Sequence, residues 1–127
     1  MEITNDIPIL SNDGKMLLGT KHPSTATNIV IPDSVTHIGF MAFYGCTSLQ
    51  RVNISNNVKN IGCYAFGDCK SLENISIHVK DIEEITIDND CFDGIDFEKC
   101  TLYIPIGSIL AYRNHPAFGN FKNIDVL

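Results

Sequence analysis

The chain has 127 residues, of which 44% are hydrophobic, with 9 basic and 15 acidic side chains and a net charge of −6. This length suits a single domain, 1–127, with a buried core. An acidic balance without a basic stripe argues against nucleic acid and anionic membranes as partners. No run of about 18 apolar residues is present, so we predict no membrane insertion. The first residues have neither the basic nor the apolar region of a signal peptide.

The first predicted element is a β-hairpin at the N-terminus. Ile9-Leu10 and the segment 16–18 are apolar, and they flank residues 11–15, which contain an Asp-Gly turn signal. We assign residues 1–28 to this hairpin and expect it to cap the first coil of the fold.

After the hairpin, the sequence repeats at a step of 23 residues. The units 29–51, 52–74 and 75–101 each begin with alternating apolar residues. A period of roughly 20 to 29 residues is typical of stacked solenoids. The alternation at Val52 and Ile54 predicts a strand with one buried face, so equivalent strands should stack as a parallel sheet about 4.8 Å apart.

The second half of each unit is predicted to return the chain to the next strand. Gly39 and Gly62 are expected to adopt a conformation closed to other residues. The pairs Ala42-Phe43 and Ala65-Phe66 each predict a short helical turn, with the phenylalanine ring filling the space between coils. The third unit is four residues longer than the others, mostly near residues 80–83, so we expect this coil to bulge on one side.

An acidic segment, 81–98, contains eight acids and no Lys or Arg. Residues 88–94 superficially resemble a calcium-binding loop. However, Phe92 and Lys99 stand at the fifth and twelfth positions, where such a loop needs oxygen ligands. We interpret the segment as a solvated bulge and predict no metal site.

The C-terminal segment, 102–127, is predicted to cap the last coil. Ser108 is in the N-cap position before a short helix at 109–112. The His115-Pro116 pair is expected to stop this helix. Four apolar residues are then available to cover the open end of the last coil: Phe118, Phe121, Ile124 and Val126.

Two strings of the first unit, IPDSVTHIG at 31–39 and AFYGCTSL at 42–49, closely resemble the BspA-like leucine-rich repeat family. The string LYIPIGS at 102–108 resembles the terminal cap common in the same family. The resemblance implies an α/β repeat solenoid: a short right-handed stack with a concave parallel sheet, an N-terminal hairpin and a C-terminal helix/strand cap. It also implies a secreted or cell-surface protein of an adhesive class that binds host proteins.

The five cysteines divide by repeat position. Cys46 and Cys69 occupy the same position, which indicates buried packing residues. Cys63, Cys91 and Cys100 have no repeat partner, so a thiol-dependent enzyme or sensor is kept as a remote alternative. No C-x-x-C pair, catalytic motif or cofactor motif is present. We therefore predict that the protein is not an enzyme and has no cofactor.

The outward side chains of the predicted sheet form the candidate binding face. They alternate with the buried residues and are mostly amides and hydroxyls, with one Arg and one aromatic, which are favoured contact residues. The predicted binding residues are Arg51, Asn53, Ser55, Asn74, Ser76, His78 and Tyr103. We interpret the chain as a non-enzymatic module that recognises a protein or glycan. The alternatives are a spacer segment of a longer cell-surface repeat protein and a plain solvated sheet.

Overall fold

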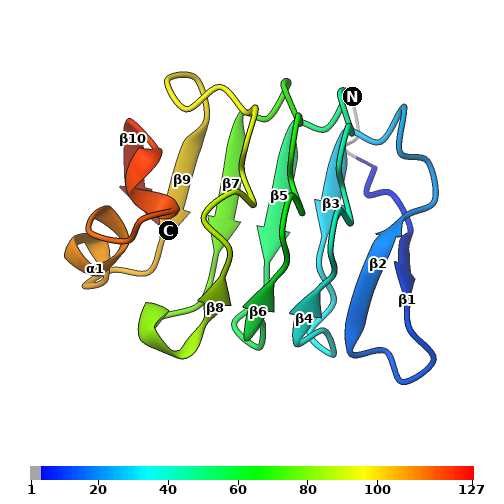
Figure 1. Cartoon of the computed structure of the whole chain (residues 1–127), viewed down its shortest axis with the longest axis horizontal. Coiled ribbons are helices and arrows are strands. Elements are labelled where there is room, and N and C mark those ends of the chain that lie inside the picture. Colours follow the sequence, from blue (N-terminus) through cyan, green and yellow to red (C-terminus); the bar gives the residue numbers. More distant parts are fainter. Residues whose placement is uncertain (1–3) are drawn as a thin grey trace.

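The computed structural model describes residues 4–127, which form a parallel β-solenoid of about five turns (Figure 1). The strands belong to two sheets. The first sheet has the order β1 (Pro8–Leu10), β2 (Met16–Thr20), β4 (His37–Ile38), β6 (Asn60–Ile61) and β8 (Thr86–Ile87). The second sheet has the order β3 (Asn28–Val30), β5 (Arg51–Ile54), β7 (Asn74–Ile77), β9 (Thr101–Ile104) and β10 (Asn123–Val126).

The second sheet confirms the stacking predicted from the 23-residue step. Its strands are parallel, and Ile29 pairs with Val52, Val52 with Ile75, and Ile75 with Leu102. All four side chains are buried. Apart from the predicted hairpin strands β1 and β2, the first sheet was not anticipated, because its repeated strands β4, β6 and β8 have only two residues each, too few to show a period in the sequence.

The predicted helical turns after Gly39 and Gly62 do not form. The chain instead makes a succession of tight turns, in which Met41 and Tyr64 have φ of 54° and Gly45 has φ of 73°. A right-handed helix cannot continue through left-handed residues. Only 9% of the chain is helical, so the α/β label is not confirmed. The helical elements are η1 (Ile82–Glu84), α1 (Ile109–Arg113) and η2 (Phe118–Asn120).

The glycines at the start of these turns are required for a different reason from the one predicted. Neither Gly39 nor Gly62 has a positive φ. A Cβ atom on Gly39 would lie 2.9 Å from the Leu17 carbonyl oxygen, and one on Gly62 would lie 2.8 Å from the Phe40 nitrogen. Each glycine therefore permits the backbones of two successive coils to approach closely.

A column of aromatic rings fills the interior between the two sheets. Phe43, Phe66 and Phe92 stack with ring centroids 5.3 and 5.7 Å apart. Phe118 and Phe121 follow at 5.5 and 5.1 Å from Phe92, so they cover the last coil as predicted. Stacked and edge-to-face rings of this kind add to the free energy gained from burying the rings.

Two cysteines line the same interior in the way the repeat predicted. Cys46 and Cys69 are buried, and the Cys69 thiol lies 3.1 Å from the Phe43 carbonyl oxygen.

The C-terminal strand agrees only in part with its prediction. Ile124 packs against the core, whereas Val126, the last residue of the edge strand β10, is 42% exposed.

At the N-terminal end, β1 and β2 pair antiparallel around the predicted Asp-Gly turn. Residues 1–3 of the assigned segment 1–28 lie outside the described residues.

At the C-terminal end, Ser108 precedes α1 as predicted, but its side chain makes no cap and donates to the Lys80 carbonyl oxygen at 2.7 Å. The inserted residues of the third coil form η1 and bury Ile82, so this bulge is not wholly solvated.

Candidate binding face

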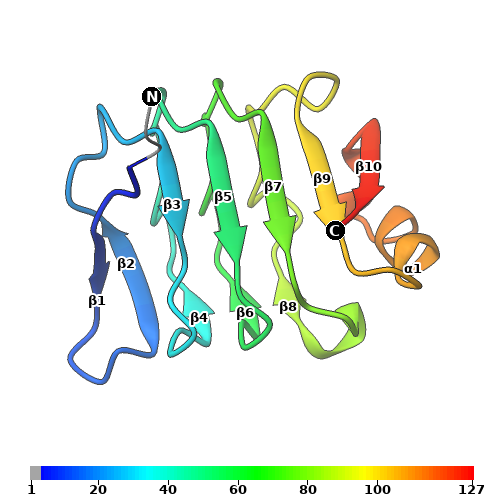
Figure 2. The same ribbon diagram turned by 180° about the vertical axis from the view of Figure 1, so that it is seen from behind.

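Figure 2 shows the strands of the second sheet side by side, and five of the seven predicted binding residues lie on these strands: Arg51, Asn53, Asn74, Ser76 and Tyr103. Val52 and Ile54 point into the core, so Arg51 and Asn53 between them point outward. The parallel register places Arg51 beside Asn74. The same register forms a second column from Asn53, Ser76 and Tyr103. Polar side chains separated by 23 or more residues thereby become neighbours on one surface.

An open depression of about 570 Å³ extends over this face. Arg51 is its only charged lining side chain, and within residues 4–127 the guanidinium makes no ion pair. Val126 and Leu127 line the same depression as Tyr103, a role that sequence reasoning missed. The sequence carries no signal for this role, because Ile124 and Val126 alternate with Asp125 and the pattern predicts that both cover the core. The lining comprises Asn28, Ile29, Val30, Arg51, Val52, Asn53, Asn74, Ser76, Tyr103, Val126 and Leu127.

A second, smaller depression of about 260 Å³ adjoins the first and shares Val30 and Asn53 with it. His78 lines it, as does Ser55, but Ser55 differs from the prediction. Ser55 is only 7% exposed, because β5 ends at Ile54 and the alternation ends with it. Its buried hydroxyl has no hydrogen-bond partner among the described residues.

Two further polar residues of the smaller depression, Asp33 and Asn56, were missed by the sequence analysis. Both lie in turns that follow a strand, where no periodicity marks the direction of a side chain. Asp33, Ser55 and His78 are residue types of a hydrolase triad. No hydrogen bond joins them in the described part of the chain, and the Ser55 oxygen is buried.

The burial of the cysteines indicates a packing role rather than a role as reactive thiolates. All five are free thiols, and only Cys63 is partly accessible. Burial raises the pKa of Cys46 to about 11 and those of Cys69 and Cys100 to about 12, and it raises the pKa of Cys91 further. These groups are therefore thiols rather than reactive thiolates at neutral pH.

Cys63 is held as a thiol by a carboxylate. Its Sγ donates to the Asp90 carboxylate at 3.0 Å, and this hydrogen bond is the main cause that raises its pKa to about 11. Residues 4–127 contain no group of three His, Cys, Asp or Glu side chains placed to hold a metal ion. In the same range, no helix has the length and apolar character needed to cross a membrane.

Parallel strands stacked coil upon coil at a regular step define a repeat-module solenoid. Comparison with protein families gives the particular class: the BspA type leucine rich repeat region matches residues 21–125 in six copies. The chain belongs to this family. Neither the curated proteins nor the solved structures yielded a match.

Proposed function

We propose that this protein is a non-enzymatic binding module that recognises a protein or glycan through the outward face of its second sheet. The observation that supports this most directly is the gathering of the polar columns around two adjoining depressions. Arg51 lies among amides in the larger depression, without an ion pair in the described residues. The contact residues are Arg51, Asn53, Asn74, Ser76, His78 and Tyr103, with Ser55 beneath them.

The side chains on this face suit recognition by hydrogen bonds. Arg51 offers several donors and fits a carboxylate, while the amides of Asn53 and Asn74 can both donate and accept. Tyr103 lies at the C-terminal end of the face beside Val126 and Leu127, where its ring can pack against an apolar or ring-shaped group. A ligand with a carboxylate near the middle and an apolar group at this end would match the face.

The same proposal assigns roles to the surface and the two ends. The second sheet is the concave side of the stack, and the protein is of a secreted or cell-surface, adhesive kind. The hairpin and the segment 102–127 are caps. Pro8 supports the first cap, because it has no N–H to offer at the edge strand β1. Tyr112 and Phe118 support the second, since both are fully buried against the last coil.

A pull-down that compares the wild-type protein with the double variant Arg51→Ala/Tyr103→Ala tests the binding face. Immobilised wild-type protein should retain a protein or glycan ligand, and the double variant should retain it about tenfold less well, because both contact types are lost. Arg113→Ala, an exposed change on α1, is the control and should retain the ligand as the wild type does. Equal retention by the wild type and the double variant would contradict the proposal.

A further inference from the structure

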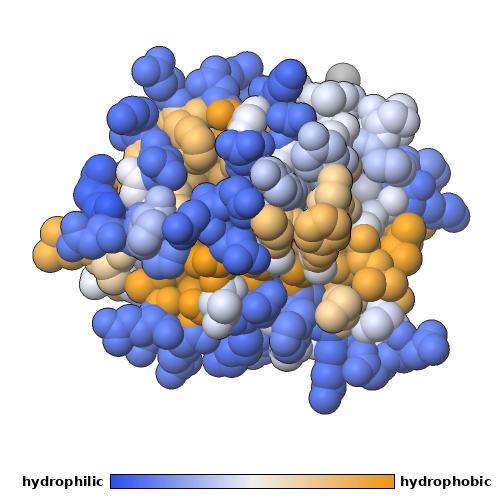
Figure 3. All heavy atoms as spheres, viewed as in Figure 1, coloured by the Kyte–Doolittle hydropathy of each residue, from blue (hydrophilic) through white to orange (hydrophobic). Residues whose placement is uncertain are grey.

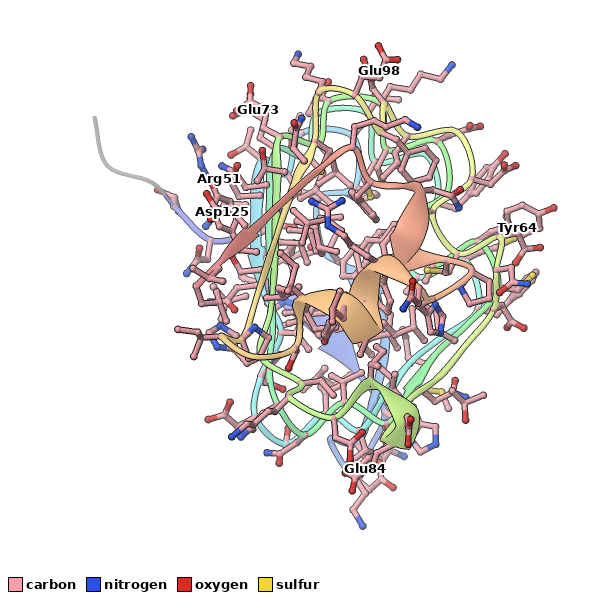
Figure 4. All side chains as sticks on the ribbon, turned by 90° about the vertical axis from the view of Figure 1, so that its left-hand side faces the viewer. Arg51, Tyr64, Glu73, Glu84, Glu98 and Asp125 are labelled. Carbon is pink, nitrogen blue, oxygen red and sulfur yellow. The ribbon has the colours of Figure 1, made fainter. Side chains whose placement is uncertain are left out.

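A different surface lies across the solenoid from the binding face. Figure 4, which looks along the stack, places Tyr64 on the side opposite Arg51. This turn face is formed by the outward side chains of β2 and of the turns after β4 and β6. Its members are Met16, Leu18, Phe40, Met41, Tyr44 and Tyr64. Phe40 is 68% exposed and Leu18 50% exposed.

The members of the turn face are neighbours, not scattered residues. Met16 lies beside Gly39, since a Cβ on that glycine would meet the methionine side chain at 3.9 Å. The Met41 nitrogen donates to the carbonyl oxygen of Cys63 at 3.0 Å, which joins the turn of one coil to that of the next. Tyr44 and Tyr64 meet edge to face, with ring centroids 6.2 Å apart. Figure 3 shows apolar residues gathered on this side, toward the N-terminal coils.

The solenoid core does not need these side chains. The core of the same turns is supplied by Phe43 and Phe66, which are fully buried, while Phe40 and Tyr44 point to solvent. Contiguous exposed apolar side chains with a polar rim mark interaction sites on soluble proteins, because water-exposed apolar surface gains free energy when a partner covers it.

The rim of the turn face toward the C-terminus is acidic. The Tyr44 hydroxyl donates to the Asp68 carboxylate at 3.1 Å, and the Asp68 nitrogen donates to the carbonyl oxygen of Asp93 at 2.8 Å. Asp90 adjoins Cys63 in the same coil. Within residues 4–127, none of these three carboxylates is ion-paired with a Lys or Arg.

We propose that the turn face binds a partner protein through a segment that presents aromatic or aliphatic side chains next to Lys or Arg. The apolar side chains of the partner would cover Phe40 and Met41, and its cations would pair with Asp68 and Asp93. Charge complementarity selects this occupant. A second copy of this chain would bring carboxylates against carboxylates, and an anionic membrane would be repelled in the same way.

Fluorescence anisotropy with three matched short peptides tests the proposal. The probe alternates Lys and Phe, and its two controls replace either every Phe by Ser or every Lys by Glu. The Lys/Phe peptide should bind the full chain at least about tenfold more tightly than either control, because only this peptide supplies both the apolar and the cationic contacts. Raised salt should weaken its binding.

Substitutions on the two faces locate the binding. Phe40→Ser and Asp93→Asn should each weaken binding of the Lys/Phe peptide by about three- to tenfold. Both side chains are exposed, so the variants should fold with unchanged thermal stability. Arg51→Ala, on the opposite face, should leave the affinity unchanged, so this test is independent of the proposed function.

Three outcomes of the peptide experiments would overturn the assignment of the turn face. One is the failure of the Lys/Phe peptide to bind, and another is equal affinity for all three peptides. The third is unchanged affinity in Phe40→Ser. Sedimentation of the protein alone adds a further check. Self-association that Phe40→Ser abolishes would assign the turn face to a second copy and would also overturn the proposal.

Discussion

The hydroxyl of Tyr112 donates a 2.6 Å hydrogen bond to the carbonyl oxygen of Val79, which precedes it by 33 residues. The bond joins α1 to the segment where the insertion of the third coil begins, and the Ser108 hydroxyl donates a second bond to the Lys80 carbonyl oxygen at 2.7 Å. The Tyr112 ring is fully buried and meets Phe118 edge to face at 5.0 Å. The C-terminal segment therefore packs against this part of the third coil.

Removal of this hydroxyl should destabilise the protein measurably. Tyr112→Phe leaves the ring in place but leaves the Val79 carbonyl without its buried donor, which should lower the free energy of unfolding by about 1–3 kcal/mol. Urea denaturation measures the change. Tyr44→Phe is the matched control. Its hydroxyl bonds to Asp68 in an exposed position, so the loss should stay within about 0.5 kcal/mol. Equal losses for the two variants would contradict the buried bond.

The protein should be more stable with glycine than with alanine at position 41. Its φ of 54° lies in the left-handed region, which costs a residue with a Cβ roughly 1–2 kcal/mol. Met41→Ala keeps this cost and loses the side chain, whereas Met41→Gly removes the cost. We expect the glycine variant to exceed the alanine variant by about 1 kcal/mol in free energy of unfolding. The usual order, with alanine more stable, would contradict the conformation of this turn.

Cys63 should become more reactive when its carboxylate partner is neutralised. The hydrogen bond to Asp90 raises the pKa of Cys63 to about 11. Asp90→Asn should return the pKa toward 9 and increase the thiolate fraction at pH 8 by about 10- to 100-fold. The rate of modification by a disulfide reagent measures this fraction. Cys63→Ser should react very slowly in the folded state, since the other four thiols are buried.

Asp6 should make stability depend on pH in the acid range. Burial raises its pKa, but hydrogen bonds from Thr20 and His22 outweigh this effect and hold the pKa well below the ordinary 3.8. The His22 ring lies 2.7 Å from the carboxylate. A carboxyl whose pKa is depressed by folding contributes stability above the unfolded value, and loses it as the pH falls toward the folded value.

The Asp6 contribution can be isolated with one substitution. At pH 5, Asp6→Asn should be less stable than the wild type by on the order of 1 kcal/mol, a figure discounted for partial solvent access. The difference should shrink between pH 4 and pH 2, because the wild-type carboxyl then binds a proton in the unfolded chain while it stays ionised in the folded one. Urea denaturation across this range measures it. A difference that stays constant with pH would contradict the role of the charge.

Sequence patterns predicted the second sheet well, but of the first sheet they predicted only the β1–β2 hairpin. Val52 and Ile54 lie on a strand long enough to show alternation, and their equivalents recur at one step. The two-residue strand His37–Ile38 shows no alternation and forms only because neighbouring coils supply its hydrogen bonds. The same limit explains the error at Ser55, where the strand had already ended and no pattern indicated the direction of the side chain.

The sequence by itself determined the 23-residue coil, its inward apolar column and the polar residues that face outward from the second sheet. These follow from a local alternation repeated in register, which needs no knowledge of what lies nearby. Only the tertiary structure decided what depends on contact between coils. Such features are the close approach at Gly39, the bond from Tyr112 to Val79 and the gathering of Phe40 with Tyr64 on the turn face. Residues distant along the chain meet there, and their partners are set by stacking.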